Sequence, residues 1–175
     1  AGGEEFFVTM LNKLAKDMGL SNTNFTNVTG MPNKDHYTTA RDLAILSQNL
    51  INDFPQQYKR FSQDTFTYNN IRQPNRNRLL KTYDYADGIK TGHTSSAGYC
   101  LSASAEKDGT RLVSVIFGAN SSKLRFKYTK TLFKYGFRNF TTEVYFKKNK
   151  IIAKERIWNG EEKYIDIGFN RDIFI

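Results

Sequence analysis

The residues best suited to chemistry lie in one short stretch, Tyr85-Ala-Asp-Gly-Ile-Lys-Thr-Gly-His-Thr-Ser-Ser-Ala-Gly-Tyr99. At its centre, Lys90-Thr91-Gly92 places an ammonium group, a hydroxyl group and a residue without a side chain in consecutive positions. The ammonium can attract a carboxylate, the hydroxyl can hydrogen-bond it, and the glycine lets an extended peptide lie close to the backbone. The N–H of His93 can donate to an oxyanion. We therefore expect an anion site, provided that this strand lies at a sheet edge, because successive side chains face opposite sides. The tripeptide alone also fits an ordinary strand with an exposed lysine.

The composition is that of a globular protein with an excess of positive charge. The chain has 175 residues, of which 39% are hydrophobic and 25% charged, enough for one domain with a sizeable core and a small appendage. Its net charge of +9 favours anionic partners, although the basic residues are spread along the chain and also fit a solvated face. One cysteine and two histidines exclude an internal disulfide and support no metal site, so we expect no metal and no cofactor.

Helical periodicity predicts three helices, over residues 3–18, 39–54 and 121–135. Gly19 and Gly136 are expected to end the first and the third, and Pro55 the second. Thr39 is a candidate N-cap for the second helix. The first helix has no clear N-cap and the chain begins Ala1-Gly2-Gly3 without a methionine, which predicts a fragment or a processed product.

Strand patterns predict an antiparallel sheet between the second and third helices. We expect a strand over 61–68, a polar loop with three arginines over 69–78 and a short strand over 88–91. Two further strands, 98–105 and 110–118, should be joined by the hairpin turn Lys107-Asp108-Gly109. Because the last strand is nearly all apolar, we expect it at the centre of the sheet.

The overall prediction is an α+β fold in which helices pack on an antiparallel sheet over residues 1–140. From residue 141 the pattern changes to short β-type runs around the turn Asn159-Gly160. Residues 141–175 are therefore expected to be the start of a small all-β domain.

The stretch Asp87-Gly-Ile-Lys-Thr-Gly-His-Thr-Ser-Ser-Ala-Gly-Tyr-Cys-Leu101 resembles the third active-site motif of the penicillin-interacting serine enzymes. Their motif set is Ser-x-x-Lys, Ser-x-Asn and Lys-Thr-Gly. The His after Lys-Thr-Gly and the following Ala-Gly-Tyr are similar to the low-molecular-mass penicillin-binding proteins, the D-alanyl-D-alanine carboxypeptidases. Segments elsewhere resemble the same family in the same order: Gly19-Leu-Ser-Asn-Thr-Asn-Phe25, Thr38-Thr-Ala-Arg-Asp-Leu-Ala44 and Asn75-Arg-Asn77. The resemblance implies part of the transpeptidase fold that these enzymes share with serine β-lactamases.

The other two family motifs have only textual matches in the chain. Ser104-Ala-Glu-Lys107 fits Ser-x-x-Lys, but it ends a predicted strand, whereas the mechanism needs Ser and Lys one helical turn apart. Ser47-Gln-Asn49 fits Ser-x-Asn, but it lies inside a predicted helix and on the wrong side of the Ala-Arg-Asp segment. We therefore expect the nucleophilic serine to be absent from this chain, upstream of Ala1, and the chain alone to be inactive.

The resemblance implies a role for each residue of the candidate site. Lys90 would position the substrate and bias proton transfer, Thr91 would hydrogen-bond the terminal carboxylate, and Gly92 would let the substrate lie close. The backbone N–H of His93 would be one donor of the oxyanion hole, and Arg76 would help to hold the carboxylate, unless it is a solvated loop arginine. For Arg125 we expect a position on a helix surface, with an approach to the site as the alternative, and we expect His36 in a loop rather than as a catalyst.

The implied function is a serine-type D-Ala-D-Ala carboxypeptidase of the bacterial periplasm or outer face of the cytoplasmic membrane. It would remove the terminal D-alanine of peptidoglycan pentapeptides through an acyl-enzyme, and β-lactams would acylate the same serine. Contact with a membrane surface would come only from a C-terminal anchor, which we expect to lie outside this chain. A β-lactamase or endopeptidase relative is the alternative enzyme, and a basic module for nucleic acid or cell-wall glycan is the alternative without catalysis. The chain lacks RNA-binding aromatic motifs and Gly-rich phosphate loops, so no nucleic-acid partner is expected.

Overall fold

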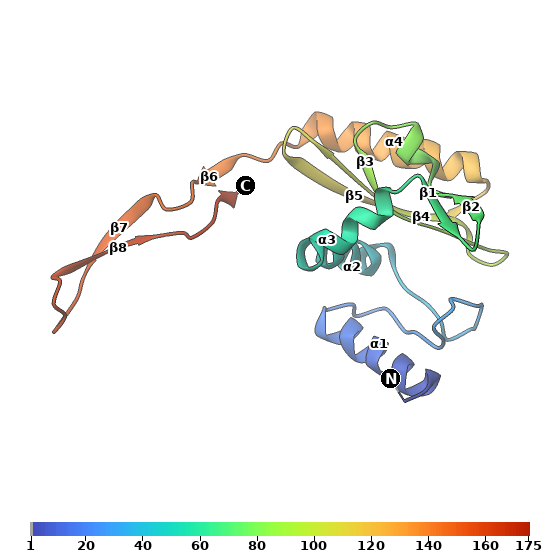
Figure 1. Ribbon diagram of the computed structural model, residues 1–175, viewed down its shortest axis with the longest axis horizontal. Coiled ribbons are helices and arrows are strands. Elements are labelled where there is room, and N and C mark those ends of the chain that lie inside the picture. The colour runs from blue at the N-terminus through green and yellow to red at the C-terminus, as the bar shows by residue number, and fades with distance from the viewer. Residues whose placement is uncertain (1) are drawn as a thin grey trace. The chain divides into compact units, whose positions relative to one another are not determined.

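The computed structural model describes residues 2–175 and divides the chain into two compact units, one ending at Asn139 and the other spanning Phe140–Ile175 (Figure 1). The first unit has helices on both faces of an antiparallel sheet, which is the predicted α+β class. No helix of the described residues is long and apolar enough to cross a membrane.

A three-stranded antiparallel sheet lies at the centre of the first unit, in the order β3 (Ala86–Thr94), β4 (Gly98–Lys107), β5 (Thr110–Ala119). The predicted hairpin between the last two strands is confirmed, with Asp108 and Gly109 at φ of 50° and 79°, as the two-residue turn requires. The predicted position of β5 is wrong for the described strands, because β4 is central. β4 carries small or apolar side chains on both faces, and this double burial is what a central strand needs.

The helix α4 (Ser122–Asn139) covers one face of the sheet. Phe133 is 1% exposed and packs with Phe126 against Leu101 and Leu79. The predicted helix end at Gly136 is wrong, since the helix continues for three more residues. Gly136 is buried, and a Cβ there would overlap Cδ1 of Leu112 on β5, so this glycine allows close approach of helix and sheet.

Two helices cover the other face, α2 (Ala40–Asp53) and α3 (Pro55–Tyr58), followed by the short 3₁₀ helix η1 (Lys59–Ser62). The predicted cap is confirmed: Thr39 Oγ1 accepts a hydrogen bond of 3.1 Å from the N–H of Asp42. Pro55 follows the end of α2 as predicted and starts α3, where its missing N–H costs nothing. The two faces of β4 therefore differ: its serines face α2 and α3, and its apolar side chains face α4.

The N-terminal helix α1 (Glu4–Asp17) is joined to α2 by a long loop. Asn12 on α1 donates to the carbonyl oxygen of Phe25 and accepts from its N–H, both at 2.8 Å. Farther along, the Asp42 carboxylate accepts from the N–H of Asn22 and the hydroxyl of Thr23. The loop is thus fastened to both helices by side-chain bonds to its backbone.

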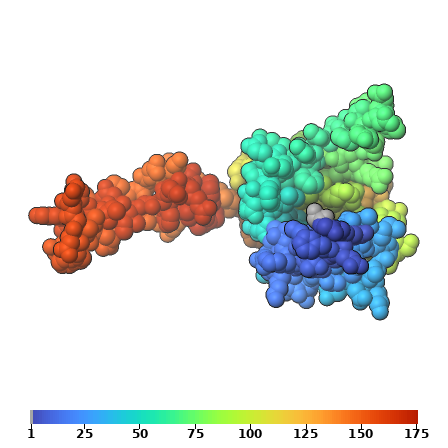
Figure 2. Space-filling model, turned by 60° about the horizontal axis from the view of Figure 1, so that its bottom comes forward, coloured from blue at the N-terminus to red at the C-terminus, as the bar shows by residue number. Residues whose placement is uncertain are grey.

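The segment before the sheet differs from its prediction. The expected strand over 61–68 is shortened to β1 (Thr65–Tyr68), and the expected loop contains β2 (Ile71–Pro74). Asn69 and Asn70, at φ of 49° and 61°, form a turn that joins the two strands into a hairpin. Figure 2 shows this hairpin in green, projecting from the body of the unit. The 3₁₀ helix η2 (Arg78–Lys81) follows and leads into β3.

The second unit is built of short antiparallel pairs. β6 (Val144–Phe146) pairs with β9 (Ile173–Phe174), and β7 (Ile151–Arg156) pairs with β8 (Tyr164–Gly168). Asn159 has a φ of 63° in the loop after β7, where the sequence predicts a turn. Its expected identity as the start of a C-terminal β domain stays a prediction.

Phe133→Ala should destabilise the first unit because it removes the most buried aromatic ring of α4. Truncation of a buried phenylalanine costs about 3–5 kcal/mol, and denaturant unfolding followed by circular dichroism measures it. Leu132→Ala is the matched control, since Leu132 is 46% exposed and should lose less than about 1 kcal/mol. Equal losses for the two variants would contradict the placement of α4.

Candidate active site

Lys90, Thr91 and Gly92 lie on β3, an edge strand of the described sheet. Lys90 pairs with Ser102 and Thr91 with Leu101, so the two side chains face opposite sides of the sheet. Only at an edge can both reach one ligand, and the strand order meets that condition. Thr91 is 7% exposed, and Lys90 Nζ, on an exposed residue, donates to the carbonyl oxygen of Thr91 at 2.6 Å.

His93 follows Gly92 on β3, and its imidazole contacts the neighbouring strand. The ring packs on Tyr99, its register partner, with 4.1 Å between ring centroids. This packing fixes the side chain against the neighbouring strand. The group of His93 that the sequence predicts as an oxyanion donor is its backbone N–H.

Arg125 on α4 holds the backbone beside that N–H. Its Nη1 donates to the carbonyl oxygens of Gly92 (3.0 Å) and Cys100 (3.2 Å), which are opposite each other in the ladder. The Gly92–His93 peptide is planar and trans, so its carbonyl and its N–H point in opposite directions. Anchoring the Gly92 carbonyl on Arg125 therefore turns the His93 N–H away from the sheet interior.

The favoured helix-surface role of Arg125 is wrong, and the alternative, an approach to the candidate site, fits its bond to Gly92. Arg125 is 7% exposed, and burial lowers the pKa of its guanidinium below the ordinary value. Within residues 2–175 its hydrogen-bond partners are the two carbonyls and Ser122 Oγ, with no carboxylate, and its Nε has no partner. A buried cation without a counter-ion favours an anionic ligand.

Arg76 shares a hollow with Arg125. This space, of about 530 Å³, lies between the segment around η2 and the start of α4, and Arg78 and Ser122 also line it. The structure thus brings together the arginine favoured as a carboxylate ligand and one for which the sequence favoured a helix-surface role. Two guanidinium groups in one hollow can bind a carboxylate with paired hydrogen bonds.

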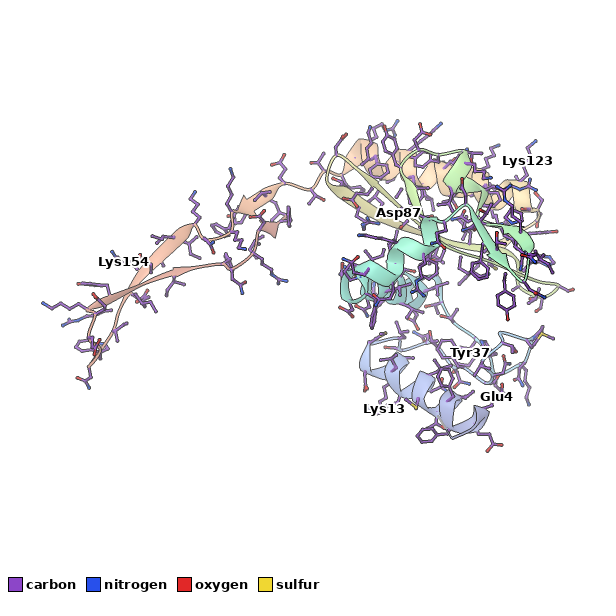
Figure 3. The ribbon with its side chains drawn as sticks, viewed as in Figure 1. Glu4, Lys13, Tyr37, Asp87, Lys123 and Lys154 are labelled. Carbon is purple, nitrogen blue, oxygen red and sulfur yellow. The ribbon has the colours of Figure 1, made fainter. Side chains whose placement is uncertain are left out.

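A partly buried polar cluster fixes the other end of β3. Ser104 Oγ hydrogen-bonds Asp87 Oδ1 and the hydroxyl of Tyr58, and Arg111 Nη1 pairs with Asp87 at 2.7 Å. Asp87, labelled in Figure 3, lies three residues before Lys90. At Gly88 an added Cβ would overlap the Tyr58 hydroxyl, and the Gly88 carbonyl accepts from Asn77 Nδ2 at 2.8 Å. These contacts set the position from which the strand runs to the site.

Ser104 and Ser47, the serines of the two segments that fit family motifs only by their letters, have structural roles. Ser104 is fully buried in the cluster just described, so no substrate can reach it. Ser47 is 3% exposed and bonds the carbonyl oxygen of Leu43 and the hydroxyl of Ser102. His36 lies against Phe25 in the loop, as expected. Among the described residues, no group of His, Cys, Asp and Glu could hold a metal ion.

A helix-covered antiparallel sheet with Lys-Thr-Gly on its edge strand is the arrangement that the resemblance to the penicillin-interacting serine enzymes implies. Residues 1–121 match the D-alanyl-D-alanine carboxypeptidase family, Peptidase_S11, and the chain belongs to that family.

Curated relatives and solved structures agree. D-alanyl-D-alanine carboxypeptidase DacC of Escherichia coli is 41% identical over 169 residues, 96% of this chain and 42% of the relative. DacA of Haemophilus influenzae is 42% identical over 178 residues, 100% of this chain and 45% of the relative. The chain thus spans less than half the length of these relatives. Penicillin binding protein 5 from Haemophilus influenzae superposes with a TM-score of 0.87 and 41% identity, covering 100% of this chain and 52% of that structure. Penicillin-Binding Protein D2 from Listeria monocytogenes, solved in a cefotaxime-bound form, matches with a TM-score of 0.71 and 35% identity, over 75% of this chain and 55% of that structure.

Arg125→Gln should loosen the end of β3. Losing a hydrogen bond to a charged group costs about 1.5–3 kcal/mol, so amides of β3 and β4 near Gly92 and Cys100 should exchange at least about tenfold faster. Hydrogen exchange followed by mass spectrometry measures this. Arg138→Gln, on the exposed part of the same helix, should leave exchange there unchanged, and equal acceleration by both variants would count against the anchoring role.

Tyr58 should make stability depend on alkaline pH. Burial raises its pKa to about 12, above about 10 for a free tyrosine. Since the folded-state pKa is the higher one, its contribution is complete below about pH 10 and falls by up to about 1.4 kcal/mol per pH unit towards pH 12.

Denaturant unfolding of Tyr58→Phe against the unaltered chain measures this effect. The variant should be the less stable at pH 9, and the difference should shrink between pH 10 and 12. Tyr68→Phe, at a residue 70% exposed, should follow the unaltered chain throughout. A difference for Tyr58→Phe that does not change with pH would refute the assignment.

Proposed function

We propose that this chain belongs to a serine-type D-Ala-D-Ala carboxypeptidase that acts on peptidoglycan pentapeptides. It supplies one wall of the active site, the edge strand with Lys90, Thr91 and Gly92, which guides the substrate. The observation that carries the proposal is the Lys-Thr-Gly edge strand, whose next N–H is turned outwards by the bond from Arg125 to Gly92. Membership of the carboxypeptidase family supports it. The wall alone distinguishes neither a carboxypeptidase from an endopeptidase nor one stem peptide from another, so the substrate is taken from the relatives.

In this proposal the substrate peptide lies along the free edge of β3, next to Gly92. Lys90 attracts the anionic end of the peptide and biases the proton transfers, and Thr91 hydrogen-bonds the terminal carboxylate. Arg76 adds a second positive group for the same carboxylate. These contacts orient the last peptide bond before any bond changes.

The reaction itself needs a serine, which we expect in a Ser-x-x-Lys motif outside these residues. Its oxygen attacks the carbonyl of the penultimate D-alanine, and the His93 N–H and the serine's own N–H stabilise the oxyanion. The terminal D-alanine leaves with a proton, and water then hydrolyses the ester. A β-lactam carries a carboxylate beside its reactive amide, so it would be guided by the same wall and acylate the same serine.

The rest of the assignment follows from this function. Peptidoglycan lies outside the cytoplasmic membrane, so the enzyme would work in the periplasm or at the outer membrane face, and any tether would belong to a C-terminal anchor. Residues 1–140 would form the later part of the catalytic domain and residues 141–175 the beginning of the C-terminal β domain.

Labelling with fluorescent penicillin tests the proposal. Residues 1–175 alone should take no covalent label. A chimaera in which they follow the preceding part of the Haemophilus influenzae relative should be labelled. A label on Ser104 or another serine of this chain, or an unlabelled chimaera beside a labelled intact relative, would contradict the proposal.

In the labelled chimaera, Lys90→Ala should slow acylation by roughly 100-fold or more, because removal of a group that stabilises developing charge costs that much. The time course of labelling measures the rate. Lys107→Ala, at the far end of β4, is the control and should change the rate less than about twofold. If Lys90→Ala acylates at the original rate, Lys90 does not have this role.

A further inference from the structure

A groove lined by positive side chains runs between η2 and α4. The hollow that holds Arg76 adjoins a second one of about 590 Å³, since Arg78, Thr82 and Ser122 line both. Together they form what we call the cationic groove, and the basic residues along it include Arg76, Arg78, Lys123, Lys127, Lys130 and Lys134. No aspartate or glutamate is among the residues that line it.

The lysines of α4 form a regular row. Residues 123, 127, 130 and 134 recur at spacings of four and three, which places them on one face of the helix. With a rise of about 1.5 Å per residue, the row is about 16 Å long and carries a positive charge about every 5 Å. Figure 3 labels Lys123, which lies at the N-terminal end of the helix. Such a row suits a chain-like ligand with repeated negative groups better than a single ion.

The positive charge in the groove is not balanced by the protein. In the described part of the chain, no salt bridge involves the groove residues, and α4 contains no acidic residue. Lys130 Nζ donates to the carbonyl oxygen of Thr82 at 2.6 Å, which ties the two walls together without neutralising either. Lys123 lies in the first turn of α4, where the helix dipole already favours anions. Like charges this close repel, so an anionic occupant would relieve the repulsion.

One end of the groove is the hollow of Arg76 and Arg125, next to the edge strand. Resting on the proposed function, this end receives the carboxylate of the terminal D-alanine, and that peptide stops there. The remaining length is then free for a neighbouring chain of the same polymer. Peptidoglycan stem peptides carry further carboxylates, and several weak contacts along a row give binding that one contact cannot.

We propose that the cationic groove binds carboxylates of stem peptides adjacent to the one being cleaved, and so holds the enzyme on polymeric peptidoglycan. Small soluble substrates and β-lactams do not reach along the groove. The groove should therefore affect attachment to the polymer and leave acylation by penicillin unchanged.

Co-sedimentation with purified insoluble peptidoglycan, freed of protein and of other wall polymers, tests the proposal. The triple variant Lys123→Gln/Lys127→Gln/Lys134→Gln should bind at least tenfold more weakly than unaltered residues 1–175, and the difference should shrink at high salt. The triple variant Lys147→Gln/Lys148→Gln/Lys150→Gln removes the same charge from the second unit and should bind within about twofold of the unaltered chain. Peptidoglycan with amidated carboxylates should not distinguish the three proteins.

Equal weakening by both triple variants, or an unchanged preference after amidation, would overturn the proposal. So would stronger competition by polyglycerol phosphate or a single-stranded oligonucleotide than by soluble peptidoglycan fragments, because phosphate would then be the preferred group. Thermal unfolding of both variants confirms that each is folded. Penicillin labelling of the chimaera carrying the groove variant separates the two proposals. Normal labelling with weakened sedimentation supports both. If the unaltered chimaera takes no label, the proposed enzymatic function is wrong, and the sedimentation result still decides whether the groove binds peptidoglycan.

Discussion

The bond from the Arg125 guanidinium to the Gly92 carbonyl is the contact on which the candidate site depends. It joins α4 to β3 and β4 at one point, and it fixes the peptide plane whose other side is the His93 N–H. An edge strand normally exposes its backbone groups in a row that any extended chain can meet. Here Arg125 fixes the carbonyl of Gly92, so the direction of the His93 N–H is set before a substrate binds.

Rigid support at both ends of β3 leaves the middle of its edge available. The Asp87–Ser104–Tyr58 cluster fixes the start of the strand, and Arg125 fixes its end. Every member of the first cluster is hydrogen-bonded, which buried polar groups require if they are to add rigidity. Arg125 differs, because it is buried without a carboxylate partner. The protein therefore leaves a cation unmatched beside the place where the proposed function puts the substrate carboxylate.

Short-range signals in the sequence predicted much of the fold. The Thr39 cap and the Asp108-Gly109 turn follow from local chemistry, and Lys90 to His93 follow from a motif that fills one strand. Arg125 was expected on a helix surface because its environment is created by the sheet, and only the folded structure places it against the carbonyls of Gly92 and Cys100. Gly136 was taken for a helix end because only the packed structure shows Leu112 opposite it.

Charge shows the same dependence on tertiary structure. Along the chain the basic residues look dispersed, and dispersion ordinarily indicates a solvated surface. Folding brings η2 beside α4, so that arginines from one segment and lysines from another line one groove that ends at Arg76 and Arg125. Like charges four residues apart destabilise a helix. Stability from other parts of the fold must offset that cost. The buried faces of β4 and the core around Phe133 supply that stability without using the groove, which leaves its positive charge available for a ligand.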